Sequence, residues 1–460
     1  MKNLATLLTA ALFCSLATHA QTTVFDYEPI KSANKKEKPI NQSVVLADEA
    51  TGQTTLVIRD YSGSIEYLLL NKDFSVESKI TPDVSNCIFN MPWFKCVGGM
   101  VTKKGSLFYY STNDKKKNSK YYLTQEMIDF KTKKVSSKQV FEFPDNESTI
   151  DFYSNQGNFY VITANDKTKE LVFYIVNDEG AVTQKSIPID LTGFNKEKLK
   201  VSEYFSYSHV SMPDQETGLN EGTDATKIYV YPDKLLILVT NKSEVPHIWT
   251  VDTRTFKIDR KKLDLQGFAS YSEKEKLNNN ICLYDKNLYV VNANKKVIEI
   301  GQFDLEGKLL KKLEINPTSE LNFLETPFLH RTKGHLSRTN KITSTKELVS
   351  EFNDGEKGIS IGKNSDGQLL VTCGAWEAMA YSTYTKTRLV KFRLLADPAD
   401  FSVIKNGNND SNYDRVKRYA VNLPATAKTT SIFRNAGKYY LGYHNTEKST
   451  YSILEFNYGD

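Results

Sequence analysis

The chain has 460 residues, which exceeds the usual size of one globular domain unless the fold is a barrel, a propeller or another repeat. Its 60 basic and 55 acidic residues are spread along the chain and leave a formal net charge of +5, so the sequence carries no electrostatic footprint for nucleic acid. The 26 Tyr and 24 Phe residues favour pleated, half-buried β-surfaces.

Residues 1–20 are predicted to be a signal peptide. A lysine precedes a short apolar run, and Thr18-His19-Ala20 places small residues at the two positions that a signal peptidase reads. The run is too short to span a bilayer, and no later stretch approaches the ~18 apolar residues of a transmembrane helix. We therefore expect an exported chain that begins at Gln21, in the periplasm or outside the cell. Cys14 would suggest a lipoprotein, but the residue before it is too bulky for an acylation signal.

Export makes the four remaining cysteines possible disulfide partners. Cys87 and Cys96 bracket a short stretch and could close a small loop. Cys282 and Cys373 lie within predicted strands, where a cysteine is more often a small buried apolar residue. The sequence leaves all three full pairings open. No spacing typical of a metal site is present, so we expect no metal and no cofactor.

Residues 151–189 predict four short strands, and they serve as a template for the rest of the chain. Runs of aromatic and β-branched residues are separated by turns at 155–157 and 178–180, with a polar loop between the second and third runs. The first apolar residue of the second strand has counterparts along the whole chain. The seven positions are Leu56, Leu107, Phe159, Leu235, Leu288, Leu369 and Tyr439.

The spacing of these positions indicates a repeat protein. Successive positions are 51, 52, 76, 53, 81 and 70 residues apart. A unit of four antiparallel strands at roughly 40 to 50 residues is typical of a β-propeller blade, and longer intervals require insertions. The chain therefore resembles β-propeller proteins at the level of architecture. It has no WD dipeptide or kelch double glycine, so the resemblance implies no activity.

We accordingly expect an all-β fold, with residues 21–460 forming a single β-propeller of four-stranded blades. Seven blades fit best, and six or eight are alternatives. Two β-sandwiches in tandem are another interpretation, which the regular recurrence disfavours. The last unit, residues 431–458, has three predicted strands, and residues 23–30 are left over near the other end of the chain. We predict that this N-terminal segment supplies the missing strand and closes the ring.

Three insertions separate the units, near residues 190–225, 316–357 and 396–427. If each one runs from the outer strand of a blade to the inner strand of the next, it lies over the mouth of the central channel. Long loops on a rigid scaffold are where function concentrates. A fourth candidate is the loop predicted at residues 373–388, within the sixth unit.

The candidate ligand-binding residues lie in these insertions and in that loop. They are Tyr204, Tyr207, His209, His330, Arg331, His335, Arg338, Trp376, Tyr381 and Tyr384. Imidazole titrates near neutrality, guanidinium pairs with carboxylates, and aromatic rings stack on sugars or anchor a protein partner. The same side chains also suit ordinary roles, as solvated loop residues or as aromatic packing at the ends of blades.

One catalytic motif is considered and set aside. Residues 358–362, GISIG, match the G-x-S-x-G pattern of a hydrolase elbow. That elbow needs a strand, a turn and then a helix, whereas this motif lies within a predicted strand. No catalytic residue is assigned.

The sequence thus favours an exported binding or scaffold module that recognises a protein or a glycan through its inserted loops. The alternative is a polysaccharide lyase or glycosidase with its site at the channel mouth. The enzyme hypothesis requires His and Arg side chains from different insertions to converge in one pocket.

Overall fold

The chain is all-β and divides into two compact units, residues 1–139 with 412–460 and residues 140–411. The computed structural model describes residues 21–28, 42–59, 64–82, 94–114, 120–190, 200–205, 208–240, 245–271, 278–320, 323–334, 336–380, 385–445, 447–448 and 450–457.

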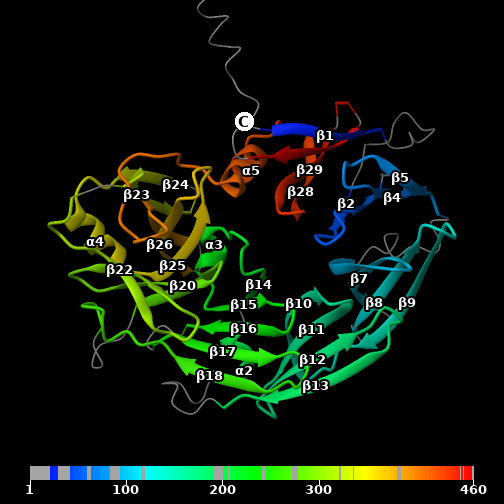
Figure 1. Cartoon of the computed structure of the whole chain (residues 1–460), viewed down its shortest axis with the longest axis horizontal. Coiled ribbons are helices and arrows are strands. Elements are labelled where there is room, and N and C mark those ends of the chain that lie inside the picture. Colours follow the sequence, from blue (N-terminus) through cyan, green and yellow to red (C-terminus); the bar gives the residue numbers. More distant parts are fainter. Residues whose placement is uncertain are drawn as a thin grey trace, which may run out of the picture. The chain divides into compact units, whose positions relative to one another are not determined.

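The described strands form seven sheets, and the template confirms the predicted blade unit. It comprises β10 (Glu147–Asn155), β11 (Asn158–Asn165), β12 (Glu170–Val176) and β13 (Val182–Pro188), which are neighbours in chain order and antiparallel. Figure 1 shows these four strands side by side. In the other sheets most consecutive strands are also neighbours, which is the organisation of β-propeller blades. A sandwich would instead move its strands between two facing sheets.

Residues 140–411 hold three further sheets. Their strands are β14 (Ser208–Ser211), β15 (Thr226–Val230), β16 (Lys234–Val239), β17 (His247–Asp252) and β18 (Ile258–Lys262); β19 (Asn279–Tyr284), β20 (Asn287–Ala293), β21 (Ile298–Phe303) and β22 (Leu309–Ile315); and β23 (Glu325–Lys333), β24 (Leu336–Lys341), β25 (Glu356–Lys363), β26 (Leu369–Ala380) and β27 (Thr385–Ala396).

The other unit also holds three sheets. Their strands are β2 (Gln42–Ala47), β3 (Thr54–Arg59), β4 (Ile65–Leu70) and β5 (Val76–Ile80); β6 (Phe94–Thr102), β7 (Gly105–Asp114), β8 (Lys120–Asp129) and β9 (Lys134–Glu142), the last of which ends just past the unit boundary; and β1 (Gln21–Tyr27), β30 (Thr450–Phe456), β29 (Lys438–Asn445) and β28 (Ala427–Asn435).

The N-terminal strand completes the last sheet, as predicted, although it starts two residues earlier. Gln21 lies opposite Phe456, and Tyr27 lies opposite Tyr451. The Tyr27 hydroxyl donates to Glu66 Oε2 at 2.9 Å, and Lys79 Nζ lies 2.8 Å from Glu66 Oε1. This polar cluster links the last sheet to the sheet of β2 to β5.

A recurring turn joins consecutive strands of several sheets. The side chain of Asp252 accepts hydrogen bonds from the backbone N–H of Arg254 and Thr255, at 2.9 and 2.7 Å. Phe256 has a φ of 55°, and its N–H donates to Asp252 O. Asp129 and Asn165 also accept from the two following N–H groups and precede a positive-φ lysine by four residues. Asx side chains stabilise such turns locally, which explains the regular Asp or Asn at these places.

Apolar side chains from consecutive sheets form the core within each unit. Phe173 of β12 and Trp249 of β17 are both fully buried in one cluster, for example. Complete burial of such a side chain contributes about 1.5–3 kcal/mol. A four-stranded sheet leaves apolar faces exposed by itself, so stacking successive sheets stabilises them all.

The insertions depart from the four-stranded plan. They contain the helices α2 (Val201–Tyr204), α3 (Leu219–Gly222), α4 (Thr345–Asn353) and α5 (Asn412–Val421). They also add β14, which pairs in parallel with β15, and β24, which pairs with β23. The prediction of a loop at residues 373–388 is wrong, because its described residues belong to the long paired strands β26 and β27.

Two further sequence predictions can be placed on this structure. The thiols of Cys282 and Cys373 are free and buried in the apolar cluster between sheets, whereas Cys87 lies outside the described residues. Within the described ranges, no helix has the length and apolar character needed to cross a bilayer.

Candidate functional site

The G-x-S-x-G motif is a docking strip for an inserted segment. Gly358 and Gly362 face residues 216–223, and a Cβ at Gly358 would lie 2.5 Å from Thr223 Cγ2. A Cβ at Gly362 would overlap the carboxyl group of Glu216. Between the glycines, Ser360 Oγ donates to Thr217 O at 2.5 Å. The motif therefore permits close packing, and its serine lies in the interior of β25, as expected from the sequence.

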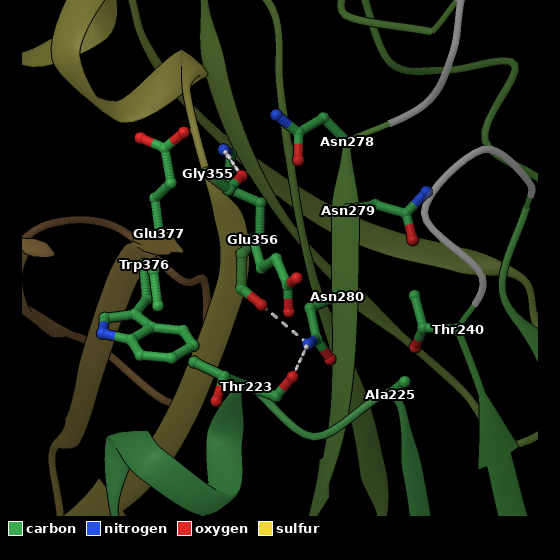
Figure 2. Close-up of a pocket in the computed structure, with 12 residues that line it drawn as sticks. Thr223, Ala225, Thr240, Asn278, Asn279, Asn280, Gly355, Glu356, Trp376 and Glu377 are labelled. Carbon is green, nitrogen blue, oxygen red and sulfur yellow. Dashed lines mark hydrogen bonds between the residues drawn. The ribbon is translucent and has the colours of Figure 1, made fainter. Parts of the chain in front are cut away.

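This docking places a pocket where the inner strands of three sheets begin, near the starts of β15, β19 and β25 (Figure 2). Its volume is about 290 Å³, at the small end for a ligand site and suited to one side chain or one sugar ring. Its lining is mostly polar. The lining residues are Thr223, Ala225, Thr240, Asn278, Asn279, Asn280, Gly355, Glu356, Lys357, Trp376, Glu377 and Ala378.

Asn280 ties the three strand starts together. Its Nδ2 donates to Lys357 O at 2.7 Å and to Thr223 O at 3.2 Å. Its Oδ1 accepts from Lys227 Nζ at 2.6 Å and from the backbone of Ile281. Figure 2 shows the amide between the two backbone segments that it joins. Such a network fixes the spacing of the pocket walls.

Lys357 closes the C-terminal end of α4 beneath the pocket. The side chain is only 2% exposed, and its Nζ donates to Gly355 O at 2.8 Å and to Asn353 O at 3.1 Å. Arg388 donates to Asp354 O nearby and pairs with Glu351 at 2.6 Å. Cations commonly satisfy the last carbonyl groups of a helix in this way. Burial lowers the pKa of Lys357 to about 7, although the carboxylate of Asp354 acts to raise it.

The walls of the pocket carry different chemistry on different sides. The indole of Trp376 is 40% exposed and forms one wall, beside Thr223. On the other side, Thr240 is 7% exposed, and its Oγ1 has no hydrogen-bond partner among the described residues. Figure 2 shows the side chain of Glu356 directed towards Asn280 and that of Glu377 directed away from it. The described residues contain no group of three or more carboxylate, imidazole or thiol side chains that would hold a metal ion.

The sheet of β23 to β27 divides the predicted residues between its two faces. His330 lies opposite Leu389, which lies opposite Trp376, and cross-strand partners share a face. His330 and Trp376 are thus two strands apart, about 10 Å. Arg331 is the next residue of β23 and projects from the other face, where it lies 3.2 Å from Glu351.

Other candidates among the described residues make contacts elsewhere. His330 Nδ1 lies 2.8 Å from Thr339 Oγ1, and Arg338 Nε donates to Asn340 at 3.0 Å. Tyr204 is buried in the apolar cluster between two sheets. His209 belongs to β14. Four candidates lie outside the described residues: Tyr207, His335, Tyr381 and Tyr384.

Of the candidates in the described residues, Trp376 is the one that lines the pocket. Sequence reasoning missed Lys357 and the run Asn278 to Asn280. Three consecutive amides directly before an inner strand were a visible signal for a polar strand start. The burial of Lys357 had no such signal, because it depends on the helix that precedes it in the fold.

Comparisons with known proteins found structural matches at low similarity. No protein-family model and no curated protein matches the sequence. Structural matches include the β-propeller domain of the Trilobed protease from Pyrococcus furiosus, at 9% identity and a TM-score of 0.35, covering 91% of this chain and 93% of that domain. The WD40 domain of SCAP from fission yeast matches at 8% identity and a TM-score of 0.35, covering 96% and 99% of the two chains.

Prolyl oligopeptidase B from Galerina marginata is a third match, at 8% identity and a TM-score of 0.34. The match covers 89% of this chain but only 46% of that enzyme. Values this low carry no inference about activity or ligand.

Proposed function

We propose that this protein is an exported binding or scaffold module that recognises a protein or a glycan, with the pocket at the starts of β15, β19 and β25 as its anchor point. The exposed indole of Trp376 on the wall of this polar pocket is the observation that carries the proposal. Partly exposed aromatic side chains beside polar groups are typical anchors for sugars and for protein partners.

The hydrogen bonds in the pocket favour binding over catalysis. Asn280 and Lys357 direct their donors to backbone carbonyl groups, which fixes the walls of the pocket. The imidazole of His330 and the guanidinium of Arg331 lie on opposite faces of their sheet. The side chains of Glu356 and Glu377 point in different directions, unlike a glycosidase pair that acts on one bond (Figure 2).

The test is a binding screen followed by a turnover assay. The chain is applied to a glycan array and to a peptide array, and each ligand found is titrated against wild type and Trp376→Ala. We expect the substitution to weaken binding at least about tenfold, as hot-spot aromatic residues do. Tyr121→Ala is the matched control, because Tyr121 is an exposed aromatic residue of β8, far from the pocket in the sequence. It should bind like wild type.

Two results would overturn the proposal. One is full binding by Trp376→Ala to every ligand found, which would place recognition elsewhere. The other is turnover of a bound glycan by the wild-type chain, which would favour the lyase or glycosidase alternative. Fractionation of cells that produce the full chain tests export separately, because cytoplasmic retention of the whole chain would contradict it.

A further inference from the structure

We propose that the group that enters this pocket is a cation, an ammonium or guanidinium on an aliphatic stem, so that the partner is a polypeptide with a lysine or arginine anchor. The inference rests on the proposed function, because it assumes that the pocket binds a ligand. It follows from three properties of the described pocket residues: how their hydrogen-bond donors are used, where charge lies, and what the exposed wall is made of.

Several donors of the pocket are directed to the chain itself. Asn278 Nδ2 donates to Asn353 O at 2.6 Å, and the Nδ2 of Asn280 serves Lys357 O and Thr223 O. Lys357 Nζ is enclosed by the carbonyls at the end of α4. Backbone carbonyls thus already engage these amide and ammonium groups. A ligand rich in acceptors, such as a carboxylate or phosphate, would find little to bind here.

An acceptor is available on the opposite wall. Thr240 is buried, and its backbone N–H donates to Ala225 O, but its hydroxyl has no partner among the described residues. A hydroxyl oxygen readily accepts a hydrogen bond from an ammonium group. A buried polar group that stays without a partner costs about 1–3 kcal/mol, and either a donor or an acceptor on the ligand would recover part of it, so the choice of a cation depends on the charges.

Negative charge is concentrated around the same opening. Glu356 and Glu377 line the pocket, and Asp224 lies between two lining residues. Burial raises the pKa of Asp224 to about 6, and the carboxylates of Glu221 and Asp151 add to this rise, whereas Lys227 opposes it. A cation bound nearby would relieve this repulsion between like charges.

Two lysines carry the opposing charge, but both are withdrawn from the opening. Lys227 and Lys357 are each 2% exposed, and their Nζ atoms are held by carbonyl and amide oxygens. Burial lowers the pKa of Lys227 to about 8, and that of Lys357 further. Lys357 therefore loses part of its positive charge near neutral pH, whereas Lys227 keeps most of its charge but is buried away from the carboxylates at the walls.

The exposed indole of Trp376 completes the set. The face of an indole attracts ammonium and guanidinium groups and also packs against an aliphatic stem. It stacks equally well on a neutral sugar ring, so the aromatic wall alone does not distinguish the two ligands. The carboxylates of the pocket favour the cation.

The experiment titrates the full chain with five probes by calorimetry and by the indole N–H resonance of Trp376, assigned with Trp376→Phe. The probes are N-acetyl-lysine amide, N-acetyl-arginine amide, N-acetyl-norleucine amide, cadaverine and methyl glucoside. Norleucine is the matched neutral probe, because it keeps the stem of lysine and lacks its ammonium group. We expect the two charged amino-acid probes to bind at least about tenfold more tightly than norleucine amide.

Glu356→Gln should weaken the binding of the lysine and arginine amides by a similar factor, because it removes the charge of the side chain and keeps its shape. Glu306→Gln, at an exposed turn before β22, is the control and should leave binding unchanged. A Glu356→Gln chain that still gives the wild-type thermal transition shows that weaker binding does not reflect loss of the fold.

The remaining outcomes separate the two proposals. Tight binding of methyl glucoside at Trp376, with no preference for charged probes, would contradict the proposal of a cationic ligand and leave the proposed binding function intact. Equal binding of norleucine and lysine amides would do the same. Stronger binding of cadaverine than of both charged amino-acid amides would contradict the proposal of a polypeptide partner and favour a free diamine as the ligand. If no probe and no array ligand shifts the Trp376 resonance, both proposals fail.

Discussion

The sheet of β10 to β13 and the sheet of β23 to β27 follow one plan with different additions. The first has short turns, and β11 and β12 are almost wholly buried by apolar packing. The second carries an added hairpin and the helix α4, and it faces the segment 216–223 across two glycines. It also buries charged groups that hold these additions in place. The comparison teaches that apolar stacking builds the scaffold, whereas polar contacts position the site.

Removal of apolar volume from the regular sheet should have the largest effect. Phe173→Ala deletes a fully buried ring from the cluster between two sheets. We expect the free energy of unfolding to fall by about 3–5 kcal/mol in urea denaturation. Val182→Ala, at an exposed position of β13, should change it by less than about 0.5 kcal/mol. Similar losses for the two variants would show that apolar stacking does not dominate this sheet.

The elaborated sheet should be more sensitive to loss of a buried charge. Arg388→Met removes the closer of two arginine partners of Glu351 and a donor to Asp354 O. We expect a loss of about 3 kcal/mol, measured by the same denaturation, because a partly buried carboxylate is left with weaker compensation. Arg338→Met is the control on β24, since Arg338 is exposed and its guanidinium donates to Asn340 on the same strand. A loss below about 1 kcal/mol for Arg388→Met would contradict this role.

The docking strip should resist any added volume. Gly362→Ala places a methyl group against the carboxyl of Glu216 and should cost about 1–3 kcal/mol. Ser360→Ala keeps the strip open and removes one hydrogen bond to Thr217 O, which should cost about 1 kcal/mol. Because alanine normally suits a strand better than glycine, a stabilised Gly362→Ala variant would show that segment 216–223 does not pack here.

Substitution of Lys357 should give the smallest effect, which is a change in how the free energy of unfolding depends on pH. Its pKa is about 7 in the folded chain and near its ordinary value of about 10.5 when unfolded. Between these values the unfolded chain holds the extra proton, so stability rises with pH by up to about 1.4 kcal/mol per pH unit. We expect Lys357→Met to reduce this rise between pH 7 and 8 by about 1 kcal/mol. Lys341→Met, at an exposed position of β24, should keep the wild-type slope.

The sequence predicted the repeated unit because local signals agree there. In the template, the glycine of each predicted turn has a positive φ, at Gly157 and Gly180, and the strand runs match β10 to β13. The pairing of β1 with β30 was predictable because the last unit had only three predicted strands and the N-terminal segment 23–30 belonged to no unit. The strand β14 escaped prediction because its four residues pair in parallel with β15, a choice that no local pattern specifies. The long hairpin of β26 and β27 escaped because polar residues at its tip indicated a loop.

The site was less predictable, because its residues depend on distant neighbours. Trp376 was proposed because it lies with Tyr381 and Tyr384 in a stretch predicted to be a loop, although it proved to lie in a strand. Asn280 gains its role from carbonyls of residues 223 and 357, which only the fold brings together. His330 and Arg331 are adjacent in sequence, and this adjacency itself places them on opposite faces of a strand.

The pairing of β1 with β30 also sets the timing of folding. Strand partners such as Thr22 and Glu455 lie at opposite ends of the chain, so their contact requires the closure of a very long loop. During synthesis the first strand leaves the ribosome long before its partner exists, and until then its backbone groups remain unpaired. The residues of β1 are therefore among the last to be ordered, and this interval is when the chain most needs protection from aggregation.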